Sequence, residues 1–112
     1  RGSSRRPRLR LLDLNPQLGT EMAKRRPCLV LSKKSLNQKT KRILICPISS
    51  TPPVSILHVS LPANQKNITG TIVVDQIKTL DFRARHAQKI DTLNDRDLYN
   101  QVVHLIQTII EL

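Results

Sequence analysis

The chain has 112 residues, enough for one hydrophobic core and too few for two ordinary domains. Its formal net charge is +11, from 19 Lys and Arg against 8 Asp and Glu, so a polyanion such as a nucleic acid is the expected partner. The apolar runs are too short to span a bilayer and the two cysteines lack metal-site or redox spacing, which argues against a membrane protein and a disulfide scaffold.

Short apolar runs in most of the chain are typical of β-strands. Aromatic residues make up only 2% of the sequence, so the core is expected to be aliphatic. Turn-forming residues such as Asn15-Pro16, Pro52-Pro53 and Gly70 separate the runs. The predicted strands, in chain order, are residues 9–14, 28–32, 43–48, 54–61, 71–74 and 88–90. Strands this short, joined by such turns, indicate a small β-barrel.

The end of the chain changes to a helical period. Asn94 is the predicted N-cap, Asp95 and Asp97 suit the positive end of the helix dipole, and Leu93 can pack on Leu98. Apolar residues recur at the spacing of one amphipathic helix at positions 98, 102, 105, 106, 109 and 112. The sequence therefore predicts a helix over about 95–112.

One domain over 8–112 is expected, with the barrel over about 8–93, since there is no internal repeat or long linker. Residues 1–7 are interpreted as a disordered arm or a vector-derived remnant. Cys28 and Cys46 lie inside apolar runs and are expected to be reduced and buried, which favours a cytoplasmic protein.

Positive charge is concentrated in one part of the sequence. Between Glu21 and Asp75 there is no carboxylate, whereas many lysines and arginines fall in that interval. One side of the fold is therefore expected to be electropositive. A merely solvated surface is the alternative, because charge runs by themselves are a weak signal.

Arg26 stands out because it directly precedes Pro27 at the start of a predicted strand. The proline keeps the preceding residue extended, and a guanidinium held there can bind a phosphate through two hydrogen bonds. Covering apolar surface is the alternative role for an arginine at a strand edge.

Most familiar catalytic signatures are absent, including a Gly-rich phosphate loop, a nucleophile elbow and a cluster of metal ligands. We therefore expect no cofactor and no metal. His58, His86 and His104 fall in three different predicted elements, so each is expected to be structural or solvated rather than part of a two-histidine ribonuclease site.

Five blocks of the sequence, in order, resemble the MazF/PemK/Kid toxins, and the resemblance runs from about Leu9 to Leu112. The last block is the most distinctive. The blocks are Asp13-Leu14-Asn15-Pro16, Gly19-Thr20-Glu21, Arg26 to Ser32, Pro47-Ile48-Ser49 and Val74 to Arg85.

This resemblance implies an SH3-like barrel of the PemK/CcdB kind with a C-terminal helix, in agreement with the strand and helix patterns. It also implies a toxin that cleaves single-stranded RNA at selected sequences without a metal, by attack of the ribose 2′-hydroxyl on the adjacent phosphate. The family's essential arginine falls on Arg26 and its catalytic threonine on Ser49. Glu21 is a candidate general base, although orienting Arg25 or Arg26 is an equally good role for it.

Further residues of these blocks are candidates for RNA binding. For Asp75 and Gln76 the alternative role is turn structure. For Arg83 and Arg85 it is a contact with the partner subunit. The set is Thr20, Lys24, Arg25, Asp75, Gln76, Arg83 and Arg85. The resemblance further implies a homodimer that a cognate acidic antitoxin inhibits.

The chain departs from the family in three places. Residues 7–11 (Pro-Arg-Leu-Arg-Leu) stand where the family has a Gly-Asp and an apolar run. Ser49 replaces the commoner threonine, and Met22 and Lys24 replace the loop's usual Gln and Gly. Two alternative functions remain: a non-enzymatic, CcdB-like gyrase inhibitor, although the chain lacks that family's Trp, and a passive RNA-binding barrel.

Overall fold

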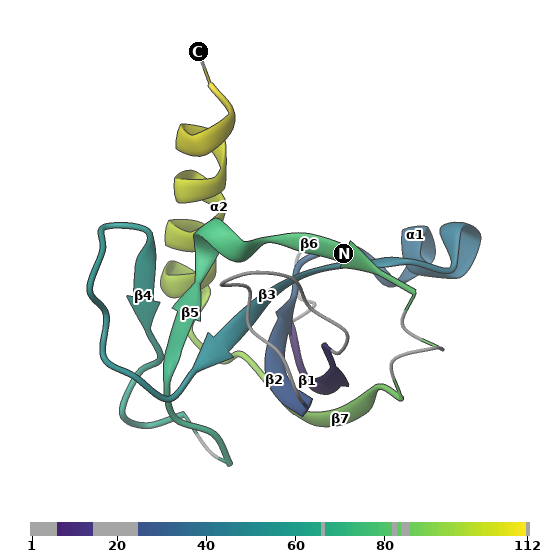
Figure 1. Ribbon diagram of the computed structural model, residues 1–112, viewed down its shortest axis with the longest axis horizontal. Helices are drawn as coiled ribbons and strands as arrows, with labels where there is room; N and C mark the ends of the chain where they lie inside the picture. The colour runs from purple at the N-terminus through teal and green to yellow at the C-terminus, as the bar shows by residue number, and fades with distance from the viewer. Residues whose placement is uncertain (1–6, 15–24, 66, 82, 84–85, 112) are drawn as a thin grey trace.

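The computed structural model describes residues 7–14, 25–65, 67–81, 83 and 86–111. Thr20, Glu21, Lys24 and Arg85 lie outside the described residues. The elements in chain order are β1 (Arg8–Asp13), β2 (Arg25–Val30), α1 (Lys34–Thr40), β3 (Ile43–Ser49), β4 (His58–Ser60), β5 (Thr71–Val73), the 3-10 helix η2 (Val74–Gln76), β6 (Lys78–Leu80), β7 (Gln88–Thr92) and α2 (Arg96–Ile110) (Figure 1).

One antiparallel sheet runs through the fold, with strands in the order β4-β5-β3-β2-β1-β7 and with β6 paired to β3. β3 is its centre, because it pairs with β6 and β2 over its first five residues and with β5 at Ile48 and Ser49. Within the described part of the chain no pairing joins β4 to β7, so the sheet curves without closing into a ring. The prediction of a mainly β fold with a C-terminal helix is confirmed, and only the closed barrel is not reproduced.

Two clusters of buried side chains form the core, one on each face of β1, β2 and β3, because successive strand residues point to opposite faces. In β2, Leu29 belongs to the first cluster, whereas Cys28 and Val30 belong to the second. α2 covers the first cluster, into which it buries Val102 completely. The two-sided burial fixes the register of the strands that carry the candidate site residues.

The N-cap of α2 is Asp95, not the predicted Asn94. The Asp95 side chain accepts a hydrogen bond from the backbone N–H of Leu98 at 3.0 Å, which satisfies one of the free donors at the helix start. Leu93 is buried and Leu98 packs against the same cluster, as expected. Tyr99 ties the helix to the sheet, since its hydroxyl donates to the carbonyl of Leu31 at 3.2 Å.

Three elements, α1, η2 and β6, were not predicted, and the predicted strand over 54–61 is much shorter. α1 and β6 fall in segments without apolar periodicity and are short, so the pattern contained no signal for them. The expected strand over 54–61 is paired only at His58–Ser60, because Val54 and Ile56 belong to an exposed loop that follows two prolines. None of the helices in the described chain is both long enough and apolar enough to cross a membrane.

Candidate RNA-binding and catalytic site

Arg26 and Ser49 lie at the same end of two neighbouring antiparallel strands. Cys28 of β2 pairs with Pro47 of β3. Arg26 lies two residues before Cys28, and Ser49 lies two residues after Pro47. The β2–β3 pairing ends at Cys28 and Pro47, so Arg26 and Ser49 both lie just beyond its last pair, at the same end of the two strands. Two of the three residues that the sequence singled out for catalysis therefore lie at the same end of neighbouring strands, and the third, Glu21, lies outside the described residues.

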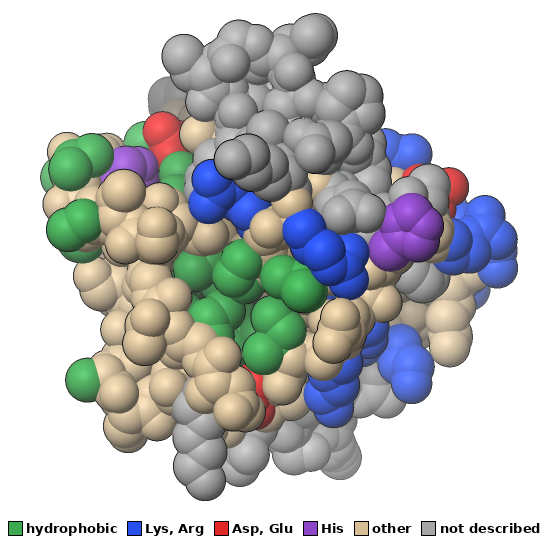
Figure 2. Space-filling view, turned by 60° about the horizontal axis from the view of Figure 1, so that its bottom comes forward, with side chains coloured by type: hydrophobic (Ala, Val, Ile, Leu, Met, Phe, Trp, Pro, Cys, Tyr) green, Lys and Arg blue, Asp and Glu red, His purple; other side chains and the backbone are tan. Residues whose placement is uncertain are grey.

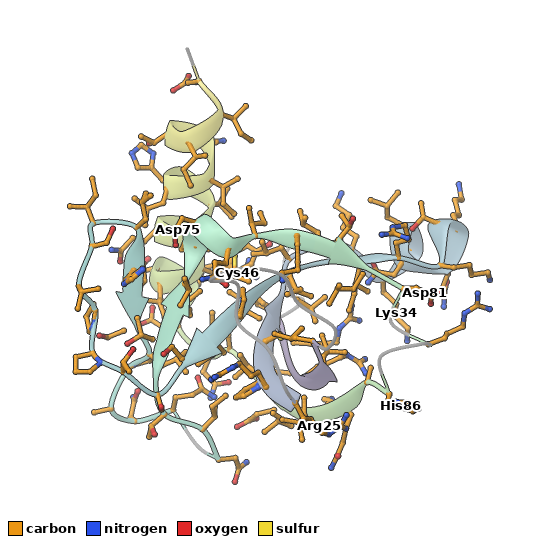
Figure 3. All side chains as sticks on the ribbon, viewed as in Figure 1. Arg25, Lys34, Cys46, Asp75, Asp81 and His86 are labelled. Carbon is orange, nitrogen blue, oxygen red and sulfur yellow. The ribbon has the colours of Figure 1, made fainter. Side chains whose placement is uncertain are left out.

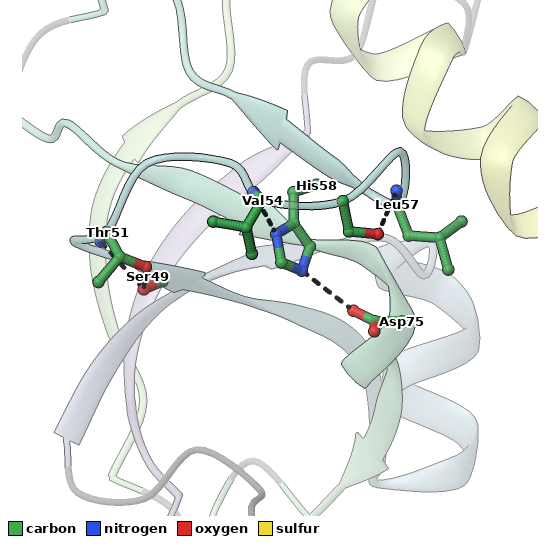
Figure 4. Close-up of polar contacts among 7 residues, drawn as sticks. Ser49, Thr51, Val54, Leu57, His58 and Asp75 are labelled. Atoms are coloured by element: carbon green, nitrogen blue, oxygen red, sulfur yellow. Dashed lines mark hydrogen bonds and ion pairs between the residues drawn. The ribbon is translucent and has the colours of Figure 1, made fainter.

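The Ser49 hydroxyl is held by the turn that follows β3 (Figure 4). Its Oγ accepts a hydrogen bond from the backbone N–H of Thr51 at 3.1 Å and lies 2.8 Å from Thr51 Oγ1. The Thr71 hydroxyl in turn donates to the Thr51 carbonyl at 2.7 Å. These bonds compensate for the rotational freedom that serine has over threonine, because they fix the position of Oγ.

Gly70 is the residue that lets β5 approach this end of β3. Its φ of +142° is one that side chains rarely permit, and a Cβ atom there would collide with the backbone oxygen of Ser49. A glycine at this position is thus required for the β3–β5 pairing that supports Ser49.

Asp75 and Gln76 lie in η2, and Asp75 faces His58 (Figure 4). His58 Nε2 is 3.6 Å from Asp75 Oδ1, while His58 Nδ1 accepts the backbone N–H of Val54 at 3.2 Å. Because Nδ1 is an acceptor, the proton of the neutral ring is on Nε2, which points at the carboxylate. His58 thereby links the exposed loop after Ser49 to Asp75.

The sequence indicated a structural or solvated role for His58 and no partner for it. Its neighbour is set by the β4–β5 pairing, in which His58 lies opposite Val73, two residues before Asp75. No motif spacing predicts such a pair, because the two residues meet only when the hairpin forms.

Arg25 and Arg83 lie in a different area from Asp75. Arg25 Nη2 donates to the backbone oxygen of His86 at 2.8 Å and to Gln88 Oε1 at 3.4 Å, so this arginine contacts the β6–β7 connection (Figure 3). Arg83 Nε lies 3.7 Å from Asp81 Oδ1 and its side chain is largely exposed. A surface pair of this kind contributes little stability, so Arg83 is available to contact a phosphate.

Lysine and arginine side chains flank a hydrophobic area on the face shown in Figure 2. Among the described residues, no group of three or more His, Cys, Asp or Glu side chains is placed to hold a metal ion.

Cys28 and Cys46 are buried free thiols, as predicted. Burial raises the pKa of each thiol to about 12, and Lys78 and Arg26 partly oppose this shift at Cys28. Both thiols therefore stay protonated at neutral pH, so neither is an activated nucleophile.

Comparison with known proteins places most of this chain in one group. Residues 5–110 match the family described as PemK-like, MazF-like toxins of type II toxin–antitoxin systems. The endoribonuclease toxin MazF of Escherichia coli (strain K12) is 32% identical over 87 residues, which are 78% of this chain and 77% of that protein.

Two solved structures of Deinococcus radiodurans proteins share the fold. The crystal structure of MazF (Form-I) matches with a TM-score of 0.87 and 30% identity, over 94% of both chains. The MazE-MazF structure (Form-II) matches with a TM-score of 0.79 and 26% identity, over 94% of this chain and 92% of that chain. The family match includes the strands that carry Arg26 and Ser49 and the η2 segment with Asp75.

Proposed function

The chain belongs to the PemK-like, MazF-like toxins of type II toxin–antitoxin systems, and from this premise we propose that it is an endoribonuclease that cuts single-stranded mRNA in the cytoplasm. The proposed reaction needs no metal: the ribose 2′-hydroxyl attacks the adjacent phosphate and leaves 2′,3′-cyclic phosphate and 5′-hydroxyl ends. The observation that carries the proposal is that Arg26 and Ser49 lie at the same end of the neighbouring strands β2 and β3. The similarity to relatives named endoribonucleases supports it over a gyrase inhibitor or a passive RNA-binding barrel.

In this mechanism Arg26 and Ser49 stabilise the transition state. A phosphate under attack gains negative charge on its equatorial oxygens, and donors already aimed at those oxygens are the strongest stabilising element available. Arg26 supplies a permanent positive charge and up to two hydrogen bonds. Ser49 supplies a hydroxyl whose oxygen is fixed by Thr51, and its proton can point at the substrate when the Thr51 hydroxyl is the donor of the contact between the two.

Two carboxylates are proposed to take part in moving protons or binding RNA. Glu21 is the candidate base from the loop before Arg26, and it remains a proposal because it lies outside the described residues. Asp75 is the second, and the Nε2–H of His58 faces one of its oxygens. Because His58 also holds the Val54 N–H, we assign it the positioning of Asp75 relative to the loop that follows Ser49.

A direct test is to incubate the purified chain with a long single-stranded RNA in EDTA and to map the ends of the products. We expect cleavage at a limited set of sequences, with cyclic phosphate on one side and a free 5′-hydroxyl on the other. Activity that vanishes in EDTA and returns with magnesium contradicts the proposed chemistry. RNA binding without any cleavage favours the passive barrel.

We also propose that the toxin is a homodimer and that its partner is an acidic antitoxin. The family description and the solved MazE-MazF structure support a protein partner. A flexible, carboxylate-rich segment suits the cationic surface around Arg25 and Arg26 because its carboxylates resemble phosphates, and charge complementarity speeds the encounter.

These partner proposals make separable predictions. Sedimentation should show a dimer at micromolar concentration, and a monomer would contradict the proposed homodimer. An acidic peptide from the neighbouring reading frame should inhibit cleavage in competition with RNA, so that more RNA restores the rate. Inhibition that excess RNA does not relieve would require a binding surface remote from Arg26.

A further inference from the structure

A cavity of about 240 Å³ lies between β1 and α1, and neither Arg26 nor Ser49 is among the described side chains that line it. Three of these side chains are cationic, namely Arg8, Arg10 and Lys34, and none of the described lining residues is acidic. The other described residues of the lining are Asn37, Gln38 and Ile43. Three like charges around one hollow repel one another, so an anion that enters it is bound favourably.

Arg8 is oriented for this role by the buried side chain of Asn37. With its amide turned so that all neighbours are satisfied, Asn37 accepts a hydrogen bond from Arg8 Nη2 at 3.1 Å and donates to the backbone oxygen of Arg42 at 3.0 Å. The guanidinium is therefore held at the wall of the cavity before any ligand arrives, which lowers the entropic cost of binding.

The cavity shares a face of the sheet with Arg26. Arg10 pairs with Cys28 and Leu12 pairs with Arg26, and paired residues of antiparallel strands point to the same side. Arg10 and Arg26 are separated by two steps along the strands, roughly 7 Å. A chain of negative charges that passes Arg26 therefore meets Arg10 next.

We propose that this cavity binds a phosphate of the RNA that flanks the cut site, as an additional contact beyond the catalytic residues. Arginines bind phosphate oxygens in pairs of hydrogen bonds and their planes also stack on unpaired bases, which suits the mixed polar and aliphatic lining. The proposal rests on the RNA cleavage proposed above.

The test compares RNAs of different length. A short oligonucleotide that covers only the cut site, and the same oligonucleotide extended on its 5′ or its 3′ side, are made resistant to cleavage by one 2′-deoxy residue. We expect the wild-type protein to bind one of the extended RNAs more tightly than the short one. In the double variant Arg10→Gln, Lys34→Gln this gain should disappear, and the log–log salt slope should fall by roughly 0.7 for each phosphate that the variant no longer binds.

Lys39→Gln is the matched control, because Lys39 is an exposed residue of the same helix that does not line the cavity. This control should keep the gain from extension, and both variants should still cleave the short oligonucleotide when it is made without the 2′-deoxy residue. The proposal is overturned if the double variant still binds the extended RNA more tightly than the short one. It is also overturned if the double variant loses binding of poly-L-glutamate but not of the extended RNA, because the cavity would then be a site for an acidic protein segment. If the wild-type protein does not cut RNA at all, the proposed function itself has failed.

Discussion

Replacing Arg26 with alanine is expected to lower the rate of RNA cleavage by about 10²–10³-fold, the cost typical of removing one donor that acts in the transition state. The protein should keep a melting temperature close to that of the wild type, because the side chain is at a strand end and only partly buried. Single-turnover cleavage of an RNA with one site measures the first quantity, and thermal unfolding measures the second.

Arg25→Ala is the matched control, since it removes the same charge from the neighbouring position. Its guanidinium is engaged with the β6–β7 connection, so we expect a smaller loss of rate that low salt restores. Ser49→Ala should also slow cleavage strongly, whereas Ser49→Thr should not, because it keeps the hydroxyl. Near-normal turnover by folded Arg26→Ala protein would rule out the proposed role of Arg26.

The parts of the fold that a sequence predicts are those with a repeated apolar pattern. α2 has such a pattern over four turns, and its predicted start is wrong by one residue only because Asn94 and Asp95 are both good caps. The runs that became β1, β2, β3 and β5 alternate or are wholly apolar because each contributes to one or both buried clusters.

The parts that escaped prediction owe their structure to distant contacts. β6 exists because Lys78–Leu80 pairs with β3, more than thirty positions away in the chain, and α1 is held by the buried amide of Asn37 rather than by an apolar face. The facing pair of His58 and Asp75 has the same origin in a β-hairpin. Propensity within a short window contains no information about such contacts.

The candidate site also contains residues that the sequence predicted and residues that only the fold reveals. Arg26 was singled out by its place before Pro27 and by the family resemblance, which also marked Ser49. The pairing of β2 with β3 then puts both residues at the same end of the two strands. Thr51 and Gly70 were not singled out, although both determine where the Ser49 hydroxyl lies. Residue type alone does not mark these roles, because Thr51 donates through its backbone N–H and Gly70 matters because it has no side chain.

A single 2′-deoxy nucleotide placed directly 5′ to the scissile phosphate should abolish cleavage at that bond. The proposed nucleophile is the hydroxyl that this change removes, and an attacking group held next to its target has an effective concentration of about 10⁵–10⁸ M, which a water molecule cannot match. The same substitution one nucleotide further away on either side is the control, and it should leave the cut at near its normal rate. Gel analysis of the three RNAs with the wild-type protein in EDTA measures all of these outcomes. Continued cutting at the 2′-deoxy position would mean that water is the nucleophile, and Glu21 or Asp75 would then have to activate it.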